Sequence, residues 1–91
     1  MSESVVLQKG FTALQSGDCA TALREWTPLA KRGNARAQHN LGSMYYSGLG
    51  VSQDYKTVVK WYRLAAEQEH SYSQYALGLM YDNGQGVPQD D

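Results

Sequence analysis

The sequence LGSMYYSGLGVSQD at residues 41–54 returns 36 residues later as LGLMYDNGQGVPQD at residues 77–90. Nine of the fourteen positions are identical, and the offset is the same at each of them. A fixed period of this length is typical of stacked helical repeats, in which each unit buries its apolar face against the next. The sequence therefore predicts an all-α solenoid.

Length and composition narrow the class of protein. A chain of 91 residues is expected to form one domain, here 1–91, and its net charge of −1 gives no reason to expect nucleic acid as a partner. Cys19 is the only cysteine, so no intrachain disulfide can form. The N-terminal stretch MSESVVLQKG has no signal-peptide pattern, and no apolar run is long enough to insert into a membrane. We expect a cytoplasmic protein, or a periplasmic or secreted one if a leader has been removed.

Apolar residues at helical spacing predict about five helices, antiparallel in pairs and wound into a right-handed superhelix, over residues 4–16, 19–32, 35–47, 54–69 and 72–83. Pro28 falls inside the second helix, where its missing N–H predicts a kink or a break. Gly42 recurs as Gly78, and we expect both to permit the close approach of a neighbouring helix. Trp61 lies one step off the apolar stripe of its helix. It is predicted to pack, partly buried, against the first helix of the next repeat near Leu77.

The pattern AxAQxxLGxMYxxGxGVxxDYxxxxxWYRxAAEQ, from Ala35 to Gln68, resembles the Sel-one-like repeat, a relative of the tetratricopeptide repeats. The resemblance covers 35–70 as one full repeat and 71–91 as most of the first half of another, preceded by an N-terminal helix pair at 4–34. Glu69 stands where the family has a turn glycine. The spacing from Trp26 to Leu41 is one residue shorter than that from Trp61 to Leu77, which predicts a shorter first junction.

The resemblance implies an α/α superhelix and a scaffold or adaptor role, since members commonly serve in signalling, secretion-related or envelope assemblies. It supplies no catalytic motif. His39 and His70 have no third ligand at metal-binding spacing, and His39 with Ser43 lacks an orienting group for catalysis. The loop glycines lack the third glycine of a dinucleotide motif. We therefore expect no enzyme activity, no metal and no cofactor.

A comparison of the two first helices separates two stripes. Identical residues form one stripe, which has to satisfy the same packing in each repeat. The differing residues fall on a second stripe, which we predict to face either a protein or peptide partner or solvent. Its members are Arg36, His39, Ser43 and Tyr46 with their counterparts Tyr72, Tyr75, Leu79 and Asp82. The alternative is a purely structural cap or spacer of a longer array, possibly self-associating, with no dedicated ligand.

The end of the sequence gives a further expectation. The fourth helix is predicted to begin near Asp54, so its counterpart in the next repeat would begin near Asp90. We expect the fifth helix to lose one covering neighbour over its inner stripe of Leu77, Met80 and Tyr81. Either the chain is a fragment of a longer protein, or a homodimer or an exchange of elements covers these three side chains.

Overall fold

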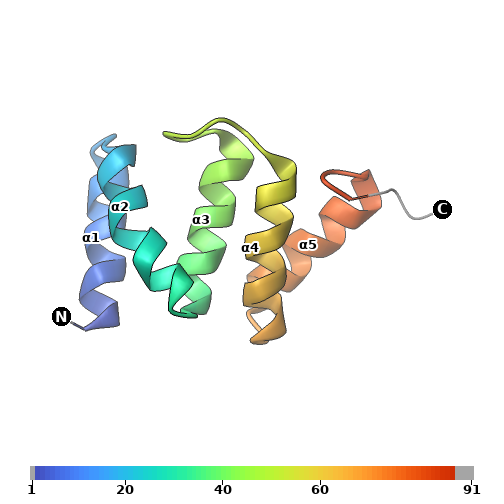
Figure 1. Ribbon diagram of the computed structural model, residues 1–91, viewed down its shortest axis with the longest axis horizontal. Helices are drawn as coiled ribbons and strands as arrows, with labels where there is room; N and C mark the ends of the chain where they lie inside the picture. The colour runs from blue at the N-terminus through green and yellow to red at the C-terminus, as the bar shows by residue number, and fades with distance from the viewer. Residues whose placement is uncertain (1, 88–91) are drawn as a thin grey trace.

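The computed structural model describes residues 2–87 and contains five helices of thirteen residues each. They stand side by side in a single row, with α1 and α2 at one end and α5 at the other (Figure 1). Within the described range there are no strands, so the prediction of an all-α α/α solenoid is confirmed. No helix in that range has the length and apolar character needed to cross a membrane. The helices are α1 Glu3–Gln15, α2 Cys19–Lys31, α3 Ala35–Ser47, α4 Tyr55–Glu67 and α5 Ser71–Asn83.

Each helix begins at a polar residue whose side chain accepts a backbone N–H from the first turn, which would otherwise have no partner. These N-cap residues are Ser2, Asp18, Asn34, Asp54 and His70. Asp18 and Asp54 each also accept a threonine hydroxyl three residues on, at 2.6 and 2.7 Å. These caps fix the helix starts, and the boundaries differ from the sequence-based ones by at most two residues.

The N-caps set a 36-residue register from Asp18 onward, because α2 and α4 begin 36 residues apart. In this register Trp26 is equivalent to Tyr62, since each is the eighth residue of its helix. The predicted shorter first junction is therefore wrong. It came from pairing Trp26 with Trp61, which stands one position earlier in α4 than the true counterpart.

The loop that joins the two helices of a hairpin is longer in the second hairpin than in the first. Residues 16–18 join α1 to α2, whereas 48–54 join α3 to α4, so the equivalent residues of α1 and α3 are 32 apart. The longer loop, which follows α3, packs against α2, the second helix of the preceding hairpin. Gly50 has φ +73°, and a Cβ there would come within 2.7 Å of Cys19 Cβ. Gly86 has φ +74° and approaches the backbone of Tyr55, the counterpart of Cys19. Only glycine meets both the conformational and the spatial requirement at these two positions.

Two local expectations have definite outcomes. Of the kink or break predicted at Pro28, the break does not occur, because α2 continues for three residues beyond it and the Arg32 N–H still bonds the Pro28 carbonyl at 3.1 Å. Glu69 adopts the left-handed conformation, with φ +64°, where its counterpart Gly33 has φ +104°. The turn before α5 therefore keeps the geometry of a glycine turn at the cost of some backbone strain.

Two hydrophobic clusters form the interior. The first joins α1, α2 and α3 with Trp61 of α4, and it includes Trp26 and Leu41. The second joins α4 and α5 through Val58, Val59, Tyr62 and Met80. The predicted neighbour of Trp61 is therefore wrong. Its ring is buried, with 7% exposed, but it belongs to the cluster on the N-terminal side and not to the one that contains Leu77.

Candidate protein interaction surface

Each complete hairpin closes through an aromatic ring that lies on a glycine. Gly10 and Gly42 are the eighth residues of α1 and α3. A Cβ at Gly10 would come within 2.0 Å of Trp26 Nε1, and one at Gly42 within 2.5 Å of Tyr62 Cε1. We call this glycine with the space above it the glycine notch. The expectation that Gly42 permits the close approach of a neighbouring helix is confirmed.

The α3 half of the predicted binding stripe lies against α4. The His39 ring stacks on Tyr62 with centroids 5.0 Å apart, and Ser43 Oγ lies 2.9 Å from the Tyr62 hydroxyl. Tyr46 packs on Tyr55 at 5.3 Å and donates to Gln85 Oε1 at 3.3 Å. These three members of the stripe are half-buried, whereas Arg36 is exposed. The expectation that the whole stripe faces solvent or a partner does not hold in α3, because these positions flank the notch that α4 fills.

A cluster of rings connects α3, α4 and the start of α5. We call it the histidine cluster, and it consists of His39, Tyr62, His70, Tyr72 and Ser73. The rings of His39 and His70 are 5.0 Å apart, and those of His70 and Tyr72 are 6.0 Å apart. The buried Ser73 Oγ lies 2.8 Å from His39 Nδ1 and 3.0 Å from His70 Nδ1.

Hydrogen bonding constrains the protons in this cluster. The Ser73 backbone N–H donates to His70 Nδ1 at 3.3 Å, so this nitrogen acts as an acceptor. The Ser73 hydroxyl can then donate to His70 and accept from His39 Nδ1–H. Burial lowers the pKa of His39 below its ordinary value, and the neighbouring His70 lowers it further. Burial also raises the pKa of Tyr62. Neutral side chains therefore suit the interior of this cluster.

The α5 half of the stripe is far more accessible. Tyr72 and Tyr75 are 75% and 72% exposed, and Leu79 is 43% exposed. Asp82 lies on the same stripe and is exposed as well. Gly78 stands at the notch position, yet no heavy atom lies within 4 Å of a Cβ built there. The close approach expected at Gly78 does not occur among the described residues.

The residues expected to mediate self-association lie on a different face of α5. Met80 is buried against α4, and Leu77 is partly buried in the same cluster. The Tyr81 hydroxyl accepts a hydrogen bond from Arg63 Nη2 at 2.6 Å. The proposed dimer through Leu77, Met80 and Tyr81 is therefore not supported, because α4 already covers this stripe. The accessible apolar side chains of α5 belong to the other stripe.

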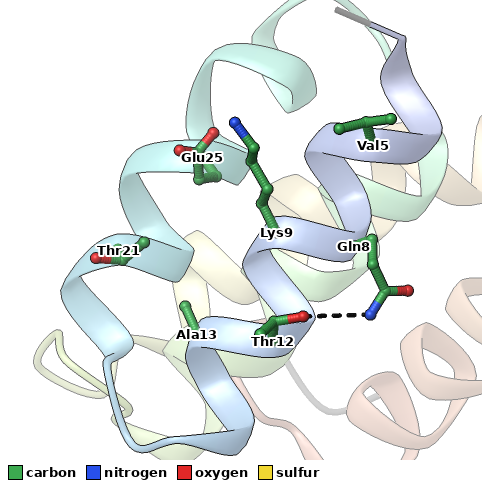
Figure 2. Close-up of a pocket in the computed structure, with 7 residues that line it drawn as sticks. All are labelled: Val5, Gln8, Lys9, Thr12, Ala13, Thr21 and Glu25. Atoms are coloured by element: carbon green, nitrogen blue, oxygen red, sulfur yellow. Dashed lines mark hydrogen bonds between the residues drawn. The ribbon is translucent and has the colours of Figure 1, made fainter.

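A shallow groove of about 470 Å³ lies at the opposite end of the row, between α1 and α2 (Figure 2). The second hairpin, α3 and α4, packs one of its faces against α2. The groove runs along the equivalent face of the first hairpin, α1 and α2. Lys9 occupies the place of Leu41, and Glu25 occupies the place of Trp61. Polar side chains thus stand where the next hairpin has buried apolar ones. The lining residues are Val5, Gln8, Lys9, Thr12, Ala13, Thr21 and Glu25.

Across residues 2–87, no three histidine, cysteine, aspartate or glutamate side chains gather where they could hold a metal ion. Sequence comparison found the stripe but missed Tyr62, His70 and Ser73 as its neighbours. A glycine at the eighth position of three helices is the signal that could have revealed which stripe meets the second helix.

The helical hairpins, the glycine notches and the repeated loops define a helical-repeat solenoid. A model of the Sel1 repeat family matches residues 35–70 and 71–91. The chain belongs to this family, whose repeat is generally a protein–protein interaction module on a non-enzymatic scaffold.

Two solved structures are similar over almost the whole chain. One is a protective antigen of uropathogenic Escherichia coli strains that displays an SLR fold. It has 35% identity and a TM-score of 0.90, and the match covers 96% of this chain and 20% of the antigen. The other is a Sel1 repeat protein from Oxalobacter formigenes, with 33% identity and a TM-score of 0.86, over 97% of this chain and 69% of that one. This chain thus spans about a fifth of the antigen. A search of curated proteins gave no match.

Proposed function

We propose that this chain is a scaffold or adaptor module that binds a protein or peptide partner through the face formed by α3 and α5. The observation that supports this most is Tyr72, whose ring is 75% exposed at the margin of the histidine cluster. Tyrosine and arginine are enriched among residues that dominate binding energy at interfaces. Arg36 is the exposed member of the stripe on α3 and stands at the position equivalent to Tyr72.

The two halves of this face have different roles in the proposal. The half-buried side chains of His39, Ser43 and Tyr46 already contact residues of this chain. These side chains are already ordered, so they lose little conformational entropy when a partner binds. The exposed Tyr72 supplies apolar area with a hydroxyl at its end, and Arg36 supplies donors for a carboxylate or a backbone carbonyl.

A crosslinking experiment tests this role directly. A photoreactive amino acid at position 72 or 36 should capture a partner in cells that produce the protein, with the captured protein then purified and its binding measured. Tyr72→Ala and Arg36→Ala should each weaken that binding at least tenfold. Leu64→Ala, on the exposed side of α4, is the matched control and should leave it unchanged. Equal affinity for a Tyr72→Ala, Arg36→Ala double variant and the unaltered chain would contradict the proposal.

A structural role as the cap of an array is a second candidate, and the charged side chains of Lys9 and Glu25 in the groove between α1 and α2 favour it. Terminal repeats carry a polar outer face, because an apolar one would associate. Lys9 and Glu25 replace a leucine and a tryptophan in the equivalent positions of the next hairpin. Lys9→Leu combined with Glu25→Trp should therefore make the chain associate as concentration rises, as measured by light scattering. A variant that stays monomeric would count against the cap role.

A further inference from the structure

The histidine cluster lies at the junction of the two matched repeats, where α5 begins. His70 is the N-cap residue of α5, and its Nδ1 accepts the Ser73 backbone N–H at 3.3 Å. Asn34 is the N-cap residue at the equivalent position of α3, and its side chain accepts the Ala37 N–H at 2.9 Å. The two caps make the same hydrogen bond, but only the imidazole takes up a proton near neutral pH.

We infer that His70 is a pH-sensitive latch, which holds the first turn of α5 against α3 when its ring is neutral and releases this turn when the ring is protonated. The latch is a conformational device within the chain and does not rest on binding at Arg36 and Tyr72. Its basis is that a single nitrogen of His70 accepts from two groups of Ser73, and that both nitrogens of a protonated imidazole are donors.

The protonated ring cannot satisfy the groups that the neutral ring satisfies. Neutral His70 Nδ1 faces the Ser73 N–H at 3.3 Å and the Ser73 Oγ at 3.0 Å. Once this nitrogen carries a proton, the Ser73 N–H and O–H both lose their acceptor. Ser73 is 0% exposed, so water cannot replace that acceptor while the turn stays closed.

The same hydroxyl connects α5 to α3. Ser73 Oγ lies 2.8 Å from His39 Nδ1, and the rings of His39 and Tyr72 are 6.4 Å apart. With His70 protonated, two N–H donors meet at this one oxygen, and its own proton has no partner. Opening of the first turn of α5 lets water hydrate these groups, so protonation favours the released form.

The rings and the helix around His70 also oppose a positive charge on it. The ring stands at the N-terminus of α5, where the helix dipole disfavours a cation. His39 faces it from α3, at 5.0 Å between ring centroids, and Tyr72 faces it from α5 at 6.0 Å. Tyr62 of α4 stacks on His39. Burial lowers the pKa of His39, and a charge on His70 lowers it further, so the first proton to enter the cluster goes to His70.

The carboxylates nearest in sequence do little to offset this. Glu67 and Glu69 come shortly before His70, and both are exposed. Arg36 lies one turn before His39 in α3 and is exposed as well. Solvent screens exposed charges strongly, so the fixed hydrogen bonds of the cluster decide how the turn responds to a proton.

Amide hydrogen exchange, followed by nuclear magnetic resonance at pH 7.5 and pH 5.5, tests the latch. The intrinsic exchange rate at each pH is divided out, which leaves the protection that the structure provides. We expect the protection of the Ser73 amide to fall at least fivefold more than that of Ala37, the equivalent amide beneath Asn34. Equal changes at the two amides would overturn the inference, because a general loss of stability affects both.

His70→Asn is the matched variant, because it gives α5 the N-cap that α3 already has. It should fold, as circular dichroism can verify, and it should abolish the differential loss at Ser73. His39→Gln removes the other titratable ring of the cluster and should retain the differential loss. A loss that persists in His70→Asn, or that disappears in His39→Gln, would overturn the inference.

A second readout needs no variant. The nuclear Overhauser effect between the rings of His39 and Tyr72 reports the contact of α3 with α5. It should weaken at least twofold as the ring-proton shifts of His70 show that residue taking up a proton. An effect that keeps its strength would show that α5 stays attached to α3, and the inference would fail. None of these measurements uses a partner, so the latch and the binding role proposed for positions 36 and 72 can fail separately.

Discussion

Gly42 and Gly78 occupy the same position of equivalent helices, yet their surroundings differ completely. Above Gly42 the ring of Tyr62 lies so close that even a methyl group would collide with it. Above Gly78 the described residues leave open space. The helices have the same length, the same glycine and the same left-handed glycine at the C-terminal end. The neighbouring helix, and not the local sequence, decides whether the position is a tight contact or an exposed surface.

The other end of the row gives a matching contrast. Trp61 and Glu25 are equivalent residues of α4 and α2, and only Trp61 faces a preceding hairpin. Glu25 instead lines the groove at the outer face of the first hairpin. The two ends of the described chain therefore differ in character, because charged Lys9 and Glu25 line the groove at the α1–α2 end whereas the α5 end exposes tyrosine and leucine.

The largest effect is expected at the buried member of the Trp61 and Glu25 pair. Trp61→Ala removes a ring from the first cluster and should lower the free energy of unfolding by about 3 kcal/mol or more. Glu25→Ala, the matched control, should change it by less than about 0.5 kcal/mol, as surface substitutions usually do. Urea denaturation measures both changes. Similar losses for the two variants would contradict the contrast between the ends.

The next largest loss of stability is expected when the hydroxyl that holds the Tyr62 ring over Gly42 is removed. Tyr62→Phe keeps the ring on the notch but removes the hydroxyl that lies 2.9 Å from Ser43 Oγ. Loss of one partly buried hydrogen bond should cost about 1 kcal/mol in the same urea assay. Tyr72→Phe removes a hydroxyl from an exposed ring and serves as the control, with an expected change near zero. If the control costs as much as Tyr62→Phe, the bond to Ser43 contributes nothing.

The smallest effect is a dependence of stability on pH. Burial, aided by the nearby His70, lowers the pKa of His39 below its ordinary value of 6.5. The folded state therefore favours neutral His39, and this contribution is present above pH 6.5 and is lost as pH falls through the lowered pKa. We expect the free energy of unfolding to decrease from pH 7 toward pH 5, and less steeply for His39→Gln. Identical slopes for the two proteins would rule out His39 as the source.

The architecture could be predicted from the sequence because it depends on local patterns. Apolar spacing located all five helices, with starts within two residues of the observed ones. The repeat of residues 41–54 established the solenoid. The predicted interaction stripe was also visible. From Arg36 to Tyr46, the residues that differ from those 36 positions later recur at helical spacing.

The surroundings of that stripe could not be predicted, because they depend on which helix lies next to which. The sequence does not distinguish the face of α3 that meets α2 from the face that meets α4, so His39 and Ser43 were assigned to an outer surface. The same uncertainty placed Trp61 beside Leu77, although its neighbours come from the preceding hairpin. Glu69 could not be predicted for a different reason. The structure around the turn before α5 holds this non-glycine residue at φ +64°, which the residue type alone does not indicate.

Paired substitution of the two glycines tests the central contrast most directly. Gly42→Ala forces a methyl group against the Tyr62 ring and should destabilise the fold by about 1–3 kcal/mol, as overpacking does. Gly78→Ala adds the same methyl group to open space and should stabilise α5 by up to about 1 kcal/mol, because alanine has the better helix propensity. We expect the two changes in the free energy of unfolding, measured in one urea series, to have opposite signs. Changes of the same sign would show that the two glycines have equivalent surroundings, and the contrast between a filled and an open notch would be wrong.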